Sequence, residues 1–281
     1  MRSEKENRLR YSIFDPTGNI TALVESPVAP ARQPAAAAAL MRRHPEVEQV
    51  GFVRFAAEPG EDGVQAQLRM AGGEFCGNAA MSTAALYRLR TALQEENGSV
   101  LVGVSGAQEP VTVRLRPEGT DCFGAAVRMP APRSIRETDF AFEGLSGRLP
   151  LVSMEGISHL LIEGASAFFP LLRDRAAAGR AVRSWCEALR AEGLGLMFLE
   201  GDGERRRLTP LVYIPGSGTE FWESSCASGS SAVGMALAAR SGAPLRLELC
   251  EPGGTLRVES APNGGETWLG GTTRLLTERT E

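Results

Sequence analysis

The chain has 281 residues, of which 43% are hydrophobic and 23% are charged. This composition is typical of globular proteins, and the length allows one large domain or two smaller ones. The 30 basic and 34 acidic residues give a net charge of −4, which argues against nucleic-acid binding, because that function requires a basic excess. No apolar stretch is long enough for a transmembrane helix and the charged N-terminus does not resemble a signal peptide, so we expect a cytoplasmic protein without membrane interactions.

Besides the cysteine motif described below, the first half shows signals for a helix near its start and for two pairs of strands. Pro34 opens an alanine-rich segment that predicts a helix ending before Pro45, because proline is favoured in a first helical turn and cannot continue a helix. Apolar runs predict strands, and the run over residues 64–70 shows clear period-two alternation. We expect these strands over residues 50–55, 64–70, 100–104 and 111–115, with a hairpin loop over residues 58–63.

In the second half, residues 129–149 contain several prolines and charges but little periodicity, which predicts a linker. After it we expect a helix over residues 182–189 and strands over residues 151–154, 160–162, 196–199, 208–214, 245–250 and 255–258. This pattern predicts a first domain over residues 1–128 and a second over residues 150–271. A last strand near residues 272–281 could return to the first domain.

A weak internal repeat relates the two halves. Cys76 and Cys226 each follow a glutamate, precede three small residues and lead into a helix of small and apolar residues. Each helix reaches an arginine, Arg90 or Arg240, at the same distance after its cysteine, and a pair of strands follows. The repeat predicts an α/β (α+β) fold of two pseudo-symmetric domains, each a curved sheet around a central helix.

The lysine and histidine content argues against several cofactors. Lys5 is the only lysine and lies in a charged leader, where a buried Schiff base with pyridoxal phosphate is implausible. The only histidines are His44 and His159, and neither has the neighbours of a catalytic zinc site. We therefore expect a protein that uses no cofactor and no metal.

The cysteines are five in number, and none forms a Cys-x-x-Cys pair, which argues against a disulfide framework and a zinc ribbon. Three of them lack the small residues that follow the other two and are interpreted as small buried apolar side chains. These three are Cys122, Cys186 and Cys250.

Cys76 and Cys226 stand at predicted helix starts. The first backbone N–H groups of a helix have no intrahelical partner and carry the positive end of the helix dipole. They form an anion site suited to a carboxylate. The same field lowers the pKa of a thiol from about 8.5 toward neutrality, so each cysteine is a candidate base beside a candidate carboxylate site.

The duplication suggests what two such thiols could do together. If the halves face each other, a bound carboxylate would place its α-carbon between the two sulfurs. One sulfur could remove a proton while the other supplies one from the opposite face, and this exchange inverts a stereocentre. The repeat therefore predicts an enzyme that inverts a stereocentre beside a carboxylate in a small-molecule substrate.

The cysteine motifs resemble those of a known family. Glu74–Ala79 and Trp222–Gly229 look like the two catalytic loops of the diaminopimelate epimerase-like family, whose racemases and epimerases use two cysteines and no cofactor. Within that family the chain is most similar to the histidine racemases of opine-type metallophore biosynthesis. Further supporting stretches are residues 15–24, 48–52, 213–215 and 252–254.

The resemblance implies roles for individual residues. It implies that Cys76 and Cys226 are the acid–base pair, that Asn19 lines the substrate site, and that the protein is a homodimer. It further implies that backbone groups bind the substrate carboxylate; these belong to Gly77, Asn78, Ala227 and Ser228. Asn19 alternatively serves only a turn.

Two departures from the family pattern bear on the substrate. Diaminopimelate epimerases carry a Glu-Arg pair before the second cysteine, but residues 216–218 contain no arginine. His159 is retained, whereas the asparagine of the Asn-Pro-His stretch is absent. The second zwitterionic end of diaminopimelate would therefore find no partners at the far end of the pocket, which favours histidine as the substrate. Candidates to contact an imidazole are Gln49, His159, Glu220, Phe221, Trp222 and Glu223.

Other functions stay open at this point. The chain could be a diaminopimelate epimerase or a racemase of another amino acid. Phenazine-type isomerases, which use a carboxylate, are disfavoured by the presence of both Cys76 and Cys226. The chain could also be a non-catalytic small-molecule binding protein of the same fold, in which the two thiols take no part in a reaction.

Overall fold

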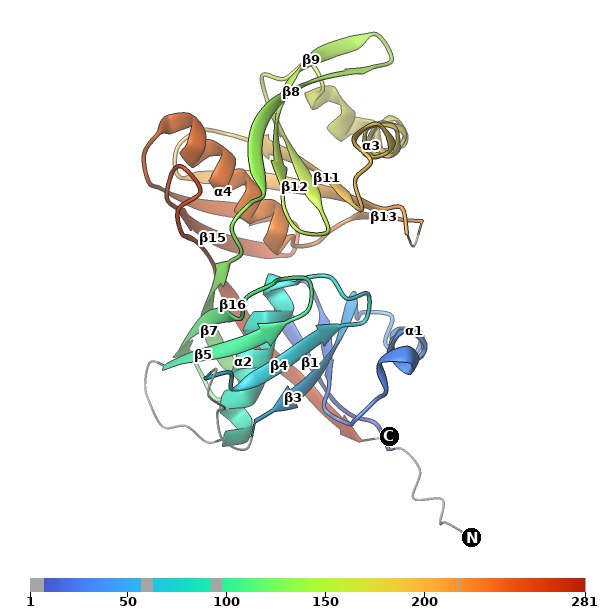
Figure 1. Cartoon of the computed structure of the whole chain (residues 1–281), viewed down its shortest axis with the longest axis vertical. Helices are drawn as coiled ribbons and strands as arrows, with labels where there is room; N and C mark the ends of the chain where they lie inside the picture. Colours follow the sequence, from blue (N-terminus) through green and yellow to red (C-terminus); the bar gives the residue numbers. More distant parts are fainter. Residues whose placement is uncertain (1–7, 57–62, 92–97, 217, 281) are drawn as a thin grey trace. The chain divides into compact units, whose positions relative to one another are not determined.

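The computed structural model describes residues 8–56, 63–91, 98–216 and 218–280. The chain divides into two compact units, Met1–Val127 with Gly270–Glu281, and Arg128–Leu269 (Figure 1). It passes from the first unit into the second within β7 (Cys122–Met129) and returns within β16 (Thr267–Thr280). Lys5 and most of the predicted loop at 58–63 lie outside the described residues. Within the described ranges, no helix is both long and apolar enough to cross a membrane.

The first unit is a sheet that closes around helix α2. Its other elements are β1 (Arg10–Pro16), β2 (Thr21–Val24), the 3-10 helix η1 (Pro30–Arg32), α1 (Gln33–Arg43), β3 (Gln49–Phe55), β4 (Ala66–Met70), α2 (Gly77–Thr91), β5 (Gly98–Val104) and β6 (Val111–Pro117). The strands pair in chain order from β1 to β7, β7 pairs with β16, and β16 pairs with β1, which closes the ring. Helix α1 lies outside the ring over an apolar cluster that includes Tyr11, Leu40 and Phe52.

The second unit has a similar sheet around helix α4, without a ring-closing strand pair among its described residues. Its elements are β8 (Ser134–Phe142), β9 (Leu145–Ser153), β10 (Ser158–Glu163), the 3-10 helix η2 (Phe169–Arg173), α3 (Arg175–Leu189), β11 (Leu194–Glu200), β12 (Arg205–Ile214), β13 (Thr219–Trp222), α4 (Ala227–Ser241), β14 (Leu245–Glu251) and β15 (Gly254–Ser260). The strand order is β16-β15-β14-β12-β11-β10-β9-β8, with β13 paired to β12. Helix α3 packs Trp185 among Phe140, Phe142 and Phe168.

Helices α2 and α4 are buried on nearly all sides, as expected for helices enclosed by sheet. Their small residues allow the strands to approach. At Gly234 in α4, a Cβ atom would lie 2.4 Å from Cγ1 of Val258 on β15, so this contact requires glycine. Figure 1 shows strands passing on several sides of α2. These features confirm the predicted α+β class with a central helix in each half.

The strand pairing repeats between the units. The parallel pair β2–β3 corresponds to β10–β11, and the parallel pair β4–β5 corresponds to β12–β14. Each cysteine helix follows the antiparallel pair β3–β4 or β11–β12. Thr21 is opposite Gln49 in the first unit, and His159 is opposite Gly195 at the same place in the second.

The prediction of a linker over residues 129–149 is wrong, because most of this segment is strand. β8 and β9 form a hairpin whose two-residue turn, Glu143-Gly144, has positive φ angles of 45° and 83°. Pro150 lies in β9 just beyond the residues that pair with β10, where its missing N–H is tolerated. The prolines and the largely solvated face of β8 explain why no strand signal was apparent.

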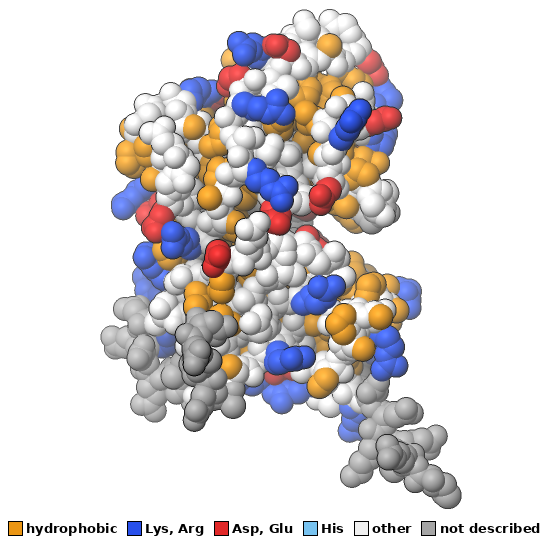
Figure 2. Space-filling view, in the orientation of Figure 1, with side chains coloured by type: hydrophobic (Ala, Val, Ile, Leu, Met, Phe, Trp, Pro, Cys, Tyr) orange, Lys and Arg blue, Asp and Glu red, His pale blue; other side chains and the backbone are white. Residues whose placement is uncertain are grey.

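The predicted helix after Pro34 and the predicted strands of both halves are confirmed, with boundaries that differ by a few residues; most strands are longer than predicted, whereas β4 starts only at Ala66. Helix α3 starts earlier than predicted, at Arg175, because the Asp174 carboxylate accepts a hydrogen bond from the N–H of Ala177 at 2.9 Å. In the space-filling view, basic and acidic side chains are interspersed over the visible face (Figure 2).

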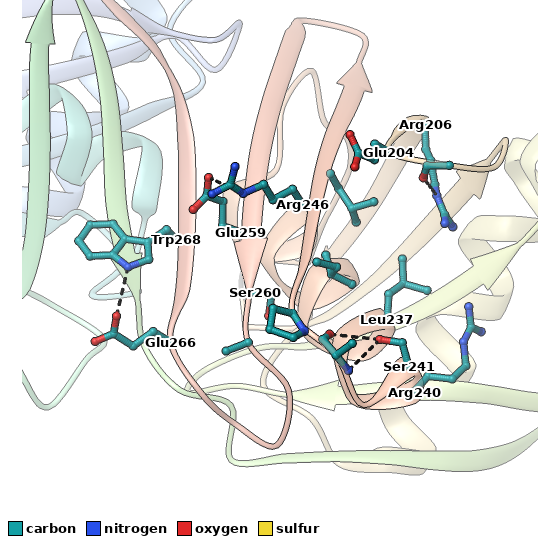
Figure 3. A pocket seen from close by; sticks show the side chains of 16 residues that line it. Glu204, Arg206, Leu237, Arg240, Ser241, Arg246, Glu259, Ser260, Glu266 and Trp268 are labelled. Atoms are coloured by element: carbon teal, nitrogen blue, oxygen red, sulfur yellow. Dashed lines mark hydrogen bonds and ion pairs between the residues drawn. The ribbon is translucent and has the colours of Figure 1, made fainter.

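A groove of about 940 Å³ crosses part of the second unit (Figure 3). Its walls include Arg206, Leu237 and Trp268, and Arg246 pairs with Glu259 along it at 3.3 Å. Neither repeated cysteine is among its lining residues. The groove is therefore separate from the two cysteines.

Candidate active site: two cysteines at helix starts

Cys76 immediately precedes α2 and is half-buried. Its carbonyl oxygen accepts the N–H of Ala80 at 3.0 Å, which begins the helical hydrogen-bond pattern. The N–H of Ala79 is directed at Sγ of Cys76 at 3.4 Å. The sulfur thus lies against the positive end of the helix, as its sequence position predicted.

A chain of amide and carboxylate groups adjoins Cys76. Its thiol donates to Oε1 of Gln49 at 3.1 Å. The Nε2 atom of Gln49 donates to Thr21 Oγ1 at 2.7 Å and to Oδ1 of Asn19. Asn19 in turn donates from Nδ2 to Glu48 at 2.9 Å. These contacts hold the Gln49 amide with its oxygen toward the sulfur, an orientation that favours the protonated thiol.

Gly77 and Asn78 form the first turn of α2, where backbone N–H groups have no intrahelical partner. The side chain of Asn78 is only 1% exposed. Its Oδ1 atom is buried without a hydrogen-bond partner in the described part of the chain. A buried acceptor in this condition is costly, and it lies two residues from the thiol.

Cys226 is the N-cap residue of α4 and is buried, with 5% of its surface exposed. The N–H of Gly229 hydrogen bonds to its sulfur, matching Ala79 in the first unit. At Gly229 a Cβ atom would lie 2.2 Å from Sδ of Met197 and 3.0 Å from Sγ of Cys226, so a side chain here would displace Met197. Sγ also lies 3.7 Å from the hydroxyl of Ser228.

Burial raises the pKa of the Cys226 thiol well above its usual range. The negative charges of Glu223 and Glu251 add to this increase, whereas the N–H of Gly229 opposes it. The sequence predicted that the helix start would lower the thiol pKa; for Cys226 this prediction is wrong, because the carboxylates and the loss of water outweigh the helix field.

His159 lies on β10 behind the start of α4. Its ring is 1% exposed, and Nε2 is 3.1 Å from the hydroxyl of Ser228. Burial lowers the pKa of His159 to about 3, so the ring is neutral. Nδ1 has no partner among the described residues. We assign the ring proton to Nε2, because a proton on Nδ1 would leave a buried donor unsatisfied.

The position of His159 depends on Gly195 of the neighbouring strand. A Cβ atom at Gly195 would lie 2.3 Å from Nδ1 of His159. In the first unit the equivalent pair is Thr21 with Gln49, whose side chain reaches Cys76. A glutamine therefore adjoins one thiol where a histidine and a serine adjoin the other.

The remaining imidazole candidates lie in different surroundings. Glu220 forms an ion pair with Arg183 of α3, and Phe221 is 58% exposed. Trp222 stacks on Phe198 with ring centroids 5.9 Å apart. Glu223 is the one that contacts a repeated cysteine, through its hydrogen bond with Cys226.

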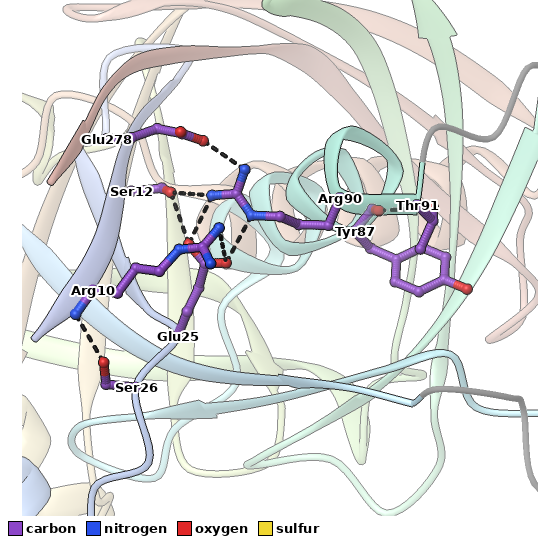
Figure 4. A network of polar contacts seen from close by, with 8 residues as sticks. All are labelled: Arg10, Ser12, Glu25, Ser26, Tyr87, Arg90, Thr91 and Glu278. Atoms are coloured by element: carbon purple, nitrogen blue, oxygen red, sulfur yellow. Dashed lines mark hydrogen bonds and ion pairs between the residues drawn. The ribbon is translucent and has the colours of Figure 1, made fainter. Parts of the chain in front are cut away.

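The far ends of α2 and α4 are tied to equivalent strands. Arg90 pairs with Glu25, directly after β2, at 2.8 Å and with Glu278 at 2.7 Å (Figure 4). Arg240 pairs with Glu163, the last residue of β10. The repeated arginines thus anchor each cysteine helix to the strand that carries Thr21 or His159.

Sequence reasoning did not identify Glu48, Gly195, Ser230 or Glu251. Glu251 directly precedes the predicted Pro252-Gly253-Gly254 turn, and this place at a strand end was the available signal. The contacts of the others join segments that are distant in the chain, for which the sequence offers no local pattern.

Residues 8–268 match the family described as the histidine racemase CntK N-terminal domain. The chain belongs to this family. It is 29% identical over 254 residues to a histidine racemase of Staphylococcus aureus, covering 90% of this chain and 88% of that protein. A histidine racemase of Fusobacterium nucleatum is 27% identical over 276 residues, covering 96% of this chain and 95% of that protein.

Solved structures share the fold of this family member at lower identity. A predicted epimerase from Pseudomonas aeruginosa has a TM-score of 0.66 at 17% identity, covering 98% of this chain and 99% of the other. A hydroxyproline epimerase from Agrobacterium vitis has a TM-score of 0.63 at 12% identity, covering 99% and 92%. These likenesses establish the fold.

Proposed function

We propose that this protein interconverts L-histidine and D-histidine without a cofactor, with Cys76 and Cys226 as the acid–base pair. The observation that carries the proposal is the equivalence of the two cysteines. Each begins the central helix of its unit, and each receives an N–H from the third residue after it. The substrate is proposed from the family and from the name of its curated relatives.

In the proposed reaction, the α-carboxylate binds N–H groups of the first helical turns, from Gly77 and Asn78 and from Ala227 and Ser228. One cysteine, as thiolate, removes the α-proton, and the other, as thiol, donates a proton to the opposite face. The electron pair left on the α-carbon spreads into the carboxylate, where the helix N–H groups stabilise it. The thiolate and thiol exchange roles in the reverse direction.

The neighbours of each sulfur support such proton transfer. The Gln49 amide oxygen accepts from the Cys76 thiol at 3.1 Å. Neutral His159 donates to Ser228, whose own proton is then directed to Cys226. Gln49, His159 and Ser228 are themselves uncharged, and the charges that act on Cys226 come from Glu223 and Glu251. Substrate ammonium, a nearby cation, would lower the thiol pKa on binding.

Histidine fits better than a substrate with a second charged end. No arginine occurs between Ile214 and Cys226 to pair with a distal carboxylate. For the imidazole we propose Gln49, Asn19 and Glu223, which lie beside the two thiols.

The wider biological setting is also a proposal. From the resemblance, D-histidine would be used in the biosynthesis of an opine-type metallophore. The homodimer and the cytoplasmic location stay predictions, checked by light scattering and by cell fractionation.

The function is tested with reduced enzyme and L-histidine in heavy water, following circular dichroism and α-deuterium together. We expect inversion by the wild type and a loss of at least about 1,000-fold in Cys76→Ala and in Cys226→Ala, a size typical of a removed acid or base. Cys122→Ala, a cysteine without the helix-start motif, is the matched control and keeps full activity.

Other results would redirect the assignment. Inversion of diaminopimelate or another amino acid in place of histidine would change the substrate and keep the chemistry. Full activity in both Cys76→Ala and Cys226→Ala would refute the two-thiol mechanism. No inversion of any amino acid, with both thiols alkylated no faster than the other three, would favour a binding protein.

A further inference from the structure

Glu251, the last residue of β14, is a buried carboxylate beneath the start of α4, with 7% of its surface exposed. Its Oε2 accepts the backbone N–H of Cys226 at 2.7 Å, and its Oε1 accepts the hydroxyl of Ser230. A side chain from a distant strand thus satisfies the N-cap N–H, a function that a glutamate of the helix itself fulfils in a capping box.

The first unit has different residues at these places. Ser230 is the fourth residue after Cys226, and the fourth residue after Cys76 is Ala80. Strand β5, which follows α2 as β14 follows α4, ends at Val104. The carboxylate–hydroxyl pair is therefore a feature of one thiol and not of its equivalent.

We propose that Glu251 is a positioning residue for Cys226, which fixes the cysteine backbone through its N–H and, in its charged form, opposes ionisation of the unliganded thiol. This inference rests on the proposed role of Cys226.

The charges around Cys226 support this role. Glu223 faces it from the segment before α4, Glu251 from β14, and neutral His159 from β10 through Ser228. Burial raises the pKa of Glu251 to about 8, although the hydrogen bonds from Ser230 and Cys226 oppose this increase. As pH rises through this range, Glu251 gains its charge, and the Cys226 thiol becomes harder to ionise.

The test is the pH dependence of iodoacetamide alkylation of each cysteine, read by peptide mass spectrometry on the unliganded full-length protein. We expect Glu251→Gln to lower the alkylation midpoint of Cys226 by about one pH unit, which is about tenfold faster alkylation below the midpoint. Glu248→Gln, on the same strand but paired with Arg257 at the surface, is the matched control and leaves the midpoint unchanged.

Ser230→Ala is the second variant, and Ala80 shows that this helix position accepts alanine. Loss of the hydroxyl favours the neutral form of Glu251, so the midpoint falls here too, by less.

An unchanged Cys226 midpoint in folded Glu251→Gln, or in folded Ser230→Ala should the first variant not fold, would overturn the inference. Since alkylation needs no substrate, the two proposals fail separately. A shifted midpoint in a protein that does not invert histidine would overturn the proposed function alone. An unshifted midpoint in an active racemase would overturn the role of Glu251 alone.

Discussion

Replacing His159 with glutamine should remove a large acid-dependent loss of stability. Burial lowers the pKa of His159 to about 3 from its ordinary 6.5. At pH 5 the unfolded chain therefore binds a proton that the folded chain does not, and stability falls as pH decreases from 6.5 toward 3. Between pH 7 and pH 5 this costs about 1.5 pKa units, or about 2 kcal/mol. Glutamine does not titrate and can still donate to Ser228.

The assay is urea unfolding at pH 7 and pH 5, followed by tryptophan fluorescence. Trp185, Trp222 and Trp268 are the only tryptophans, and all lie in the unit that carries His159. We expect the wild type to lose about 2 kcal/mol more than His159→Gln between the two pH values. His44→Gln, which changes the other histidine, is the control whose effect is subtracted. Equal pH dependence of wild type and His159→Gln would show that the ring is not buried and neutral.

Two further predictions concern packing around the cysteine helices. Arg90→Met should cost about 2 kcal/mol of unfolding free energy, because it leaves the nearly buried Glu25 without its main partner. Arg240→Met, at the equivalent but more exposed position, should cost less than about 1 kcal/mol in the same urea titration. Gly195→Ala puts a methyl group where His159 Nδ1 lies and should lower kcat/KM about 100-fold, the scale expected for a displaced site group. Gly164→Ala, where a Cβ atom meets nothing within 4 Å, is its control. Equal stability losses in the first pair, or equal activity in the second, would contradict these assignments.

The sequence predicted the parts of the fold that depend on local pattern. Cys76 and Cys226 were found because a helix start with small residues is a continuous motif, repeated once. The hairpin β8–β9 was missed because its exposed face and its prolines hide the alternation that identifies a strand. Strand signals of this kind become visible only when the partner strand is known.

The surroundings of the thiols could be predicted only in part. Gln49 was named as a candidate, but its contact with Cys76 arises from the register of β2 and β3. Glu251 and Cys226 are brought together by the return of β14 beneath α4. The balance between helix field and burial at Cys226 depends on that packing, so its direction could not be obtained from the motif alone.

The exchange of Thr21 and Gln49 in one half for His159 and Gly195 in the other has a consequence for how such halves diverge. The bulk beside the thiol is carried by one strand in the first case and by its neighbour in the second. In the second half, a Cβ atom at Gly195 would lie 2.3 Å from Nδ1 of His159, so the histidine depends on a glycine of the neighbouring strand. Placing a histidine at position 21 of the first half would by the same reasoning require a smaller residue than Gln49 on the adjacent strand.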